Sequence, residues 1–148
     1  MTTVKRFSIQ DRVRWSDVDR AGIIYFGSYV RFFEVAETEM YRAIGLPYAE
    51  AFDVLDVYPV RAQFHFDFHS PAYLDDLLTT ELWVSHIGTS SIRLDFEIIR
   101  RASAHTDADV ILVTGHCVQV TVDRTTYKPR RMPERLREGL QAYLNLPT

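Results

Sequence analysis

The sequence predicts an α+β fold in which an antiparallel β-sheet covers one long central helix. Three features of the chain predict this arrangement. A strand-like segment over 4–15 comes first, a long and largely apolar helical segment over 26–44 follows it, and four strand-like segments then come in direct succession. Consecutive strands without intervening helices favour antiparallel pairing, and an apolar helix needs a sheet face on which to bury its side chains.

The helix prediction rests on the spacing of apolar residues between positions 26 and 44. They recur every three or four residues, at Tyr29, Phe32, Phe33, Ala36, Met40, Ala43 and Ile44. Apolar side chains occupy much of the circumference, which predicts burial on several sides. Gly45, with Pro47 two residues later, is typical of a helix C-terminus.

The segments after this helix are rich in Val, Ile, Thr, Phe and Tyr, which favour strands. After a short helical turn near 47–53, we expect strands over 57–69, 76–87, 90–101 and 109–123. Polar and aromatic residues alternate between 63 and 69, which places Phe64, Phe66 and Phe68 on one face. Residues 134–144 predict a short C-terminal helix.

Composition limits the class of protein. A chain of 148 residues with 47% hydrophobic residues predicts one domain with room for a core. The formal net charge of −3 argues against a broad nucleic-acid-binding surface, and no apolar run approaches the roughly 18 residues of a membrane span. The N-terminal residues lack the apolar core of a signal peptide, and the single cysteine, Cys117, is expected to be a structural thiol. We therefore expect a cytoplasmic protein.

The most informative segment lies between residues 15 and 26. Two carboxylates, Asp17 and Asp19, follow the first strand-like run, and Gly22 then leads to the expected start of the helix near Phe26. The N-terminus of a helix carries unpaired N–H donors and positive potential, which stabilise a developing oxyanion. The segment therefore predicts that a carboxylate and backbone donors converge on one substrate carbonyl.

This segment resembles the signature of the hotdog-fold acyl-CoA thioesterases of the 4-hydroxybenzoyl-CoA thioesterase class. The signature runs Asp-x-Asp, two residues, Gly, two β-branched residues and paired aromatics, and it matches 17–26 with Tyr29 after it. Supporting matches follow in order at Gly45-Leu46-Pro47, Tyr58-Pro59-Val60 and Pro71-Ala72-Tyr73-Leu74-Asp75-Asp76-Leu77-Leu78. The resemblance implies a single hotdog domain over 1–148. In this family the sheets of two subunits pair edge to edge, and the active sites lie at the interface.

The same resemblance implies hydrolysis of a small or medium acyl-CoA, with an aromatic or alkyl acyl group. It assigns the catalytic carboxylate to Asp19 and the oxyanion donor to the backbone N–H of Phe26. Asp19 either attacks the thioester to give a mixed anhydride or acts as general base on water. Asp17 is expected to order the loop or to tune the pKa of Asp19, and Gly22 to supply a tight turn. No cofactor is implied, because the CoA thioester is the substrate.

Substrate contacts are expected from the resemblance at Tyr25, at Tyr29 and along Tyr58-Pro59-Val60. Tyrosines at helical spacing are more often core residues, and Tyr58-Pro59-Val60 is equally typical of a strand that starts with an edge proline. Hydroxybenzoyl-specific relatives carry basic residues at the turn between the third and fourth strands, where this chain has none. We therefore expect CoA contacts from the backbone and hydroxyls of Gly88, Thr89 and Ser90. Alternative phosphate partners are Arg93, Arg100, Arg101, Lys128, Arg130 and Arg131.

Other interpretations stay open. The substrate is either a CoA thioester or an acyl-carrier-protein thioester, and a non-catalytic acyl-CoA sensor is the third alternative. Glu34 and Glu37 are disfavoured as catalytic acids, because the His-Gly-Gly motif of the other thioesterase branch is absent. His65, Asp67 and His69 share a strand face at two-residue spacing, but we expect a polar outer face there and no metal. A homodimer or a homotetramer is expected, without nucleic-acid or membrane partners.

Overall fold

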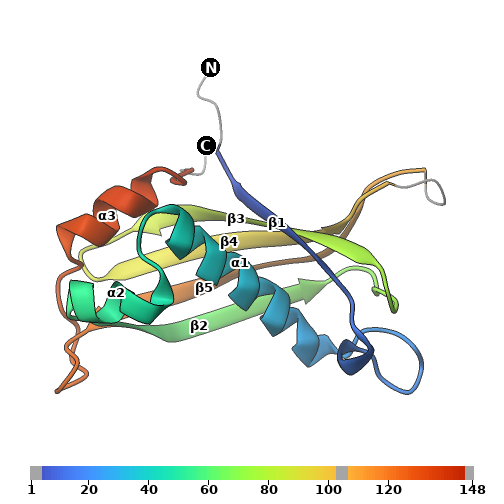
Figure 1. Ribbon diagram of the computed structural model, residues 1–148, viewed down its shortest axis with the longest axis horizontal. Coiled ribbons are helices and arrows are strands. Elements are labelled where there is room, and N and C mark those ends of the chain that lie inside the picture. The colour runs from blue at the N-terminus through green and yellow to red at the C-terminus, as the bar shows by residue number, and fades with distance from the viewer. Residues whose placement is uncertain (1–4, 103–106, 146–148) are drawn as a thin grey trace.

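The computed structural model describes residues 5–102 and 107–145, and it confirms the α+β fold with a central helix (Figure 1). The strands are β1 (Phe7–Arg12), β2 (Tyr58–Phe68), β3 (Leu77–Ile87), β4 (Ser91–Arg100) and β5 (Val110–Val122). The helices are α1 (Tyr29–Ala43), α2 (Tyr48–Leu55) and α3 (Glu134–Gln141), with short 3-10 helices η1 (Trp15–Asp17) and η2 (Phe26–Ser28). The helix start expected at Phe26 is therefore a 3-10 turn that leads into α1.

All five strands form one antiparallel sheet in the order β1-β3-β4-β5-β2. Its two edges differ. At one edge β1 covers only the first half of β3, and the C-terminal segment continues along β3, where the N–H of Val84 donates to the carbonyl of Tyr143 and the N–H of Asn145 donates to Val84. At the other edge, no described strand pairs with the outer side of β2. An unpaired strand edge of 11 residues is a template for pairing with another chain.

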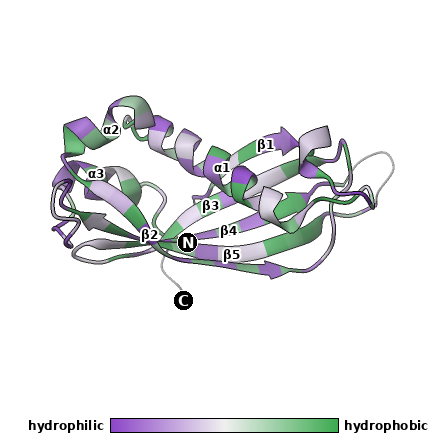
Figure 2. Ribbon diagram, turned by 90° about the horizontal axis from the view of Figure 1, so that it is seen from below, coloured by the Kyte–Doolittle hydropathy of each residue, from purple (hydrophilic) through white to green (hydrophobic). Residues whose placement is uncertain are grey.

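Helix α1 crosses one face of the sheet (Figure 2). Seven of its 15 residues are buried, and they share the side that faces the sheet, whereas Val30, Glu34, Arg42 and Ala43 are exposed, so within one chain the helix is not buried on several sides. Phe32, Phe33, Ala36 and Met40 are each at most 1% exposed. The C-terminus lies where the sequence predicts it: Gly45 has φ +83, and the N–H of Leu46 donates to the carbonyl of Tyr41. This is the left-handed glycine cap of a helix C-terminus. Within residues 5–102 and 107–145, no helix has both the length and the apolar character needed to cross a membrane.

The inner face of β2 carries the predicted phenylalanines, which stack along the strand toward α1. A β-bulge at Ala62 shifts the pairing with β5, so that Arg61 lies opposite Gln119 while Phe64 lies opposite Cys117. Because of the bulge, Arg61 and Phe64 both face the helix although they are three residues apart. The predicted alternation is therefore confirmed from Phe64 onward.

Gly115 provides the space for these rings. A Cβ atom at this position would lie 2.1 Å from the carbonyl oxygen of His65 and 2.6 Å from the ring of Phe96. We expect Gly115→Ala to lower the free energy of unfolding by about 2 kcal/mol, because backbone and a packed ring must both move. Urea unfolding measures this. Gly88→Ala is the matched control, since its new Cβ meets first the rotatable hydroxyl of Ser91; equal losses in the two variants would contradict the packing argument.

Candidate active site

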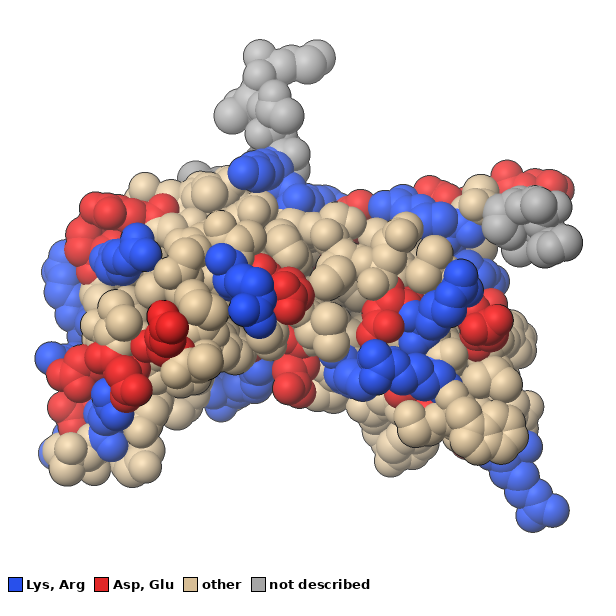
Figure 3. Space-filling model, viewed as in Figure 1, with Lys and Arg blue, Asp and Glu red and all other residues tan. Residues whose placement is uncertain are grey.

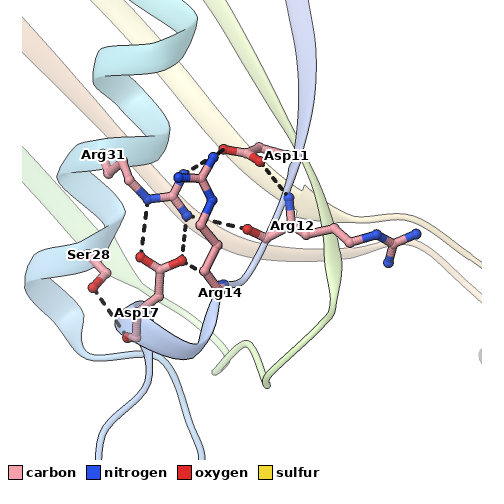
Figure 4. Close-up of polar contacts among 6 residues, drawn as sticks. All are labelled: Asp11, Arg12, Arg14, Asp17, Ser28 and Arg31. Carbon is pink, nitrogen blue, oxygen red and sulfur yellow. Dashed lines mark hydrogen bonds and ion pairs between the residues drawn. The ribbon is translucent and has the colours of Figure 1, made fainter.

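Asp17 is buried at the junction between the first strand and the helix (Figure 4). Its carboxylate accepts hydrogen bonds from the backbone N–H of Arg14 at 2.7 Å and from the guanidinium of Arg31, which engages both oxygens. Its carbonyl accepts from the N–H of Tyr25 and the hydroxyl of Ser28. One residue therefore connects η1, the loop and the first turn of the helix.

Arg31 extends the same network to β1. Its Nη1 donates to Asp11 at 2.5 Å, and its Nη2 also contacts the carbonyl of Arg12. Burial alone would raise the pKa of the Asp17 carboxyl, but the hydrogen bonds from Arg31 and Arg14 and their charges lower this pKa below its ordinary value. Burial would lower the pKa of Arg31, whereas Asp17 and Asp11 raise it. Both groups are therefore held in their charged forms.

Asp19 lies on the turn that follows. Its backbone N–H donates to the carbonyl of Ile23, its carbonyl accepts from Gly22, and its Oδ1 accepts from the N–H of Ala21 at 2.8 Å. Gly22 has φ +80, and a Cβ added there would meet no atom within 4 Å, so the turn needs glycine for its backbone conformation. Asp19 is exposed, and no described residue donates a hydrogen bond to its Oδ2. Its catalytic role stays a prediction.

The start of the helix offers free donors. Phe26 is the first residue of η2, and no described residue accepts a hydrogen bond from its backbone N–H. An unpaired N–H is expected there, because the first N–H groups of a helix have no intrahelical acceptor. The Phe26 side chain is 64% exposed, and its ring contacts those of Tyr25 and Phe68.

A groove of about 280 Å³ opens beside this helix start. It is lined by Ile24, Phe26, Tyr29, Phe68, His69, Ser70 and Pro71. Of the predicted site residues, Phe26 and Tyr29 therefore line the groove, while Asp19 does not. Burial raises the pKa of Tyr29, so its hydroxyl stays neutral at ordinary pH. Within one chain, the groove is an apolar site with a helix N-terminus at its side.

The other predicted contacts lie at the opposite end of the sheet. Tyr58 begins β2, whereas the groove lies at the end of that strand, which is roughly 33 Å away at about 3.3 Å per residue. The ring of Tyr58 stacks on Tyr127. The turn with Gly88 and Thr89 is at the same end, and its carbonyls accept hydrogen bonds from Arg137 and Met132. One chain therefore does not bring these groups to Phe26.

Most of the alternative phosphate partners are already paired. Arg93 donates to Asp95, Arg100 to Asp76, Arg101 to Glu81 and Asp109, and Arg130 to Asp56. Positive and negative side chains are intermixed on the face that Figure 3 presents. The ion pairs lower the availability of these arginines for CoA, because binding a phosphate would require breaking them.

The structure also holds a buried ion pair that the sequence did not predict. Glu37 on α1 is 1% exposed and accepts hydrogen bonds from Nη1 and Nη2 of Arg61, at 2.8 and 2.7 Å. Tyr48 and Gln119 also donate to this carboxylate. One indication was present in the sequence, an acidic residue on an otherwise apolar helix face. The partner of Glu37 could not be predicted, because no local sequence pattern indicates the bulge that turns Arg61 toward the helix.

The outer face of the sheet is polar, as the sequence predicts. His65 lies 3.0 Å from Asp67 and stacks on His116 across the strands, and His69 bonds to Thr114. Among the residues that the structure describes, no group of three or more His, Cys, Asp or Glu side chains is arranged to hold a metal ion. Cys117 is buried, and this burial raises the pKa of its thiol.

Together, an antiparallel sheet wrapped on one helix and the Asp-x-Asp loop at the helix start define a hotdog-fold thioesterase. The chain belongs to the thioesterase-like superfamily, whose sequence model matches residues 13–140. The acyl-CoA thioester hydrolase YbgC of Escherichia coli O157:H7 is 29% identical over 133 residues, which cover 90% of this chain and 92% of the relative.

Two further proteins share this similarity. The 1,4-dihydroxy-2-naphthoyl-CoA hydrolase of Synechococcus elongatus is 25% identical over 136 residues, covering 91% of this chain and 95% of the relative. The crystal structure of Slr0204, a 1,4-dihydroxy-2-naphthoyl-CoA thioesterase from Synechocystis, superposes with a TM-score of 0.81 at 20% identity and covers 93% of this chain and 96% of that one. This superposition confirms the hotdog fold.

The Asp17 network leads to a prediction about stability. We expect Asp17→Asn to lower the free energy of unfolding by about 2 kcal/mol at neutral pH, because a buried charge-assisted interaction is lost. The lowered pKa means that the ion pair stabilises the fold above the ordinary carboxyl pKa of 3.8 and that this contribution is lost as the pH falls through the lowered value. The difference between wild type and variant therefore shrinks as the pH falls below about 5, and it is lost once the pH is below the lowered pKa.

Chemical unfolding at several pH values measures this difference. Asp53→Asn is the control, since the Asp53 side chain is 78% exposed and its ion pair with Arg124 lies at the surface. Exposed ion pairs contribute little to stability. A pH-independent difference for Asp17→Asn, or one no larger than that of the control, would show that the network is not held by its charge.

Proposed function

We propose that this protein hydrolyses the thioester bond of an acyl-CoA, releasing the free acid and CoA, at a site formed by two copies of the chain. The observation that supports this most directly is the backbone N–H of Phe26, which has no acceptor among the described residues and belongs to a residue that lines the apolar groove. A donor of this kind stabilises the oxyanion that forms when the thioester carbonyl is attacked. Membership of the thioesterase-like superfamily supports the same chemistry.

Asp19 supplies the carboxylate. Its Oδ1 is engaged by Ala21, which orients the side chain, and its Oδ2 has no donor among the described residues. Either Oδ2 attacks the carbonyl carbon and expels the CoA thiolate, leaving a mixed anhydride for water to hydrolyse, or it takes a proton from a water that attacks directly. In both routes the negative charge that develops on the carbonyl oxygen is held by the N–H of Phe26.

The groove takes the acyl group rather than the coenzyme. At about 280 Å³ it is near the lower limit of ligand pockets, which is roughly 300 Å³, so it is too small for a whole acyl-CoA. Three of its lining residues, Phe26, Tyr29 and Phe68, are aromatic. The relatives named for 1,4-dihydroxy-2-naphthoyl-CoA support an aromatic acyl group. We therefore favour a small or medium acyl group, with a ring among the preferred forms.

A second copy completes the site. The unpaired edge of β2 favours antiparallel pairing with the same edge of another copy, and a two-fold axis then lays the Tyr58 end of one strand beside the Phe68 end of the other. Tyr58, Pro59 and Val60 of one subunit would then border the groove of the other. Thr89, which is exposed, and the turn around it lie at that same end, where they are available to CoA.

Replacing Asp19 tests the catalytic assignment. We expect Asp19→Asn to lower kcat for acyl-CoA hydrolysis by about 10³-fold, because the amide is neither a nucleophile nor a base. The fold should be retained, since the amide oxygen still accepts the hydrogen bond from Ala21. Release of free thiol from a panel of benzoyl- and alkanoyl-CoAs measures the rate.

Asp67→Asn is the matched control, because Asp67 is an exposed carboxylate on the outer face of the sheet. We expect its rate to stay within about twofold of wild type. Near-normal thiol release by Asp19→Asn would remove Asp19 from the mechanism. Tight binding of acyl-CoA by the wild-type protein without thiol release would instead favour the sensor.

Mixing subunits tests the shared site. Asp19→Asn and Tyr58→Ala chains are each expected to be slow, but a mixture unfolded and refolded together should regain activity. In a two-fold dimer, about half of the random pairs are hybrids and each hybrid holds one intact site, so about a quarter of all sites recover. No gain over the two separate variants would place Asp19 and Tyr58 in different sites.

A further inference from the structure

A continuous row of aromatic rings leads away from the groove along the open edge of the sheet. The ring of Phe68 lies 5.8 Å from Tyr29 and stacks on Phe66 at 5.9 Å, and Phe66 stacks on Phe64 at 4.6 Å. Phe64 in turn lies 4.7 Å from Phe33 on α1. Phe68 is 53% exposed, and Phe64 and Phe66 are half-buried, so the row keeps a surface that an apolar group can cover.

Arg61 stands at the far end of this row. Its guanidinium carbon lies 5.4 Å from the ring centroid of Phe33 and 5.5 Å from that of Phe64. The side chain is 37% exposed, whereas its partner Glu37 is buried. The bulge at Ala62 turns Arg61 toward the helix, and the bidentate contact with Glu37 fixes the plane of the guanidinium.

Two donors of this guanidinium remain unused. A guanidinium has five N–H groups. Nη1 donates to Glu37 and to Cys117, and Nη2 donates once to Glu37, which leaves one N–H on Nη2 and the N–H of Nε without an acceptor among the described residues. Because Glu37 neutralises the charge of Arg61, the pair offers hydrogen bonds without a net positive charge.

We propose that Arg61 determines acyl specificity by donating hydrogen bonds to a neutral oxygen at the far end of the acyl group, which lies along the phenylalanine row. This rests on the proposed hydrolysis at the groove. The favoured oxygen is a hydroxyl, carbonyl or ether. A carboxylate is disfavoured, because it would lie beside the carboxylate of Glu37 without a net positive charge to balance it.

The length of the row sets the size of the acyl group. Phe64 and Phe68 are four residues apart on one strand, which corresponds to roughly 13 Å. A single benzoyl ring held at the groove does not reach Arg61. A medium chain of about ten carbons with a terminal oxygen does, and its apolar stem would lie against the stacked phenylalanines.

Two thioesters that differ by one hydroxyl test the proposal. For the wild-type protein we expect kcat/KM for ω-hydroxydecanoyl-CoA to exceed that for decanoyl-CoA about tenfold, the effect of one charge-assisted hydrogen bond at a partly exposed site. The mono-CoA thioester of decanedioic acid should be no better than decanoyl-CoA. In Arg61→Lys, which keeps a cation beside Glu37 but loses the planar donor fork, the ratio should fall toward one.

Arg42→Met is the matched control: Arg42 also pairs with a glutamate, Glu39, but on the exposed side of α1. It should keep the wild-type ratio. Because Arg61 supports a buried carboxylate, the double variant Glu37→Gln with Arg61→Met is the second test, and it should also lose the preference. Equal rates for the two thioesters in wild type, an unchanged ratio in the Arg61 variants, or a preference for the diacid thioester would overturn the proposal.

The same comparison by binding separates this proposal from the proposed hydrolysis. Calorimetric titration of the Asp19→Asn protein with each thioester should give an about tenfold lower Kd for the hydroxylated one, and Arg61→Lys in that background should abolish the difference. A binding preference without thiol release from wild type would refute hydrolysis and support the role of Arg61. Thiol release from wild type with no preference in rate or Kd would support hydrolysis and refute the role of Arg61.

Discussion

The ion pair between Asp17 and Arg31 is the interaction on which the organisation of this site depends. It joins the η1 turn to the first turn of α1, and Arg31 also donates to Asp11 near the end of β1. The pair lies at a buried position where a lone carboxylate would be strongly unfavourable. The two guanidinium bonds and the N–H of Arg14 offset that cost. Because the carbonyl of Asp17 also receives the N–H of Tyr25, the entry of the chain into the helix is fixed at the same point.

This arrangement explains why two aspartates two residues apart have different properties. Both carboxylate oxygens of Asp17 accept hydrogen bonds within the protein, and the bonds from Arg31 and Arg14 lower its pKa. The role of Asp17 is therefore structural. Asp19 is exposed, and its Oδ1 accepts a hydrogen bond from Ala21 within its own turn, whereas no described residue donates to its Oδ2. The proposed catalyst is therefore positioned by a neighbour whose own oxygens are all engaged.

Local pattern predicted the elements, and long-range contacts decided the site. The three- and four-residue spacing, the glycine at position 45 and the alternation around Phe66 are each complete within one segment, so helix, cap and strand were predictable. The partner of Asp17 lies 14 residues away on another element, and that of Glu37 lies 24 residues away, next to a bulge. Neither contact produces a periodic pattern in the sequence. The separation of Tyr58 from the groove follows from the packing of the helix start against the Phe68 end of β2, a long-range contact that the pattern of a single strand does not encode.

The open edge of β2 connects the proposed association with the proposed specificity. The phenylalanine row and Arg61 lie along this long edge strand, whose outer side pairs with no described strand, so a second copy that pairs there also shields the row from water. An acyl group on the row would then be bound between subunits rather than on one chain. Binding and association are linked under these conditions, because a ligand that binds the dimer better than the monomer stabilises the dimer by the ratio of the two affinities. The marginal volume of the groove in one chain is consistent with this, since its remaining walls would come from the partner.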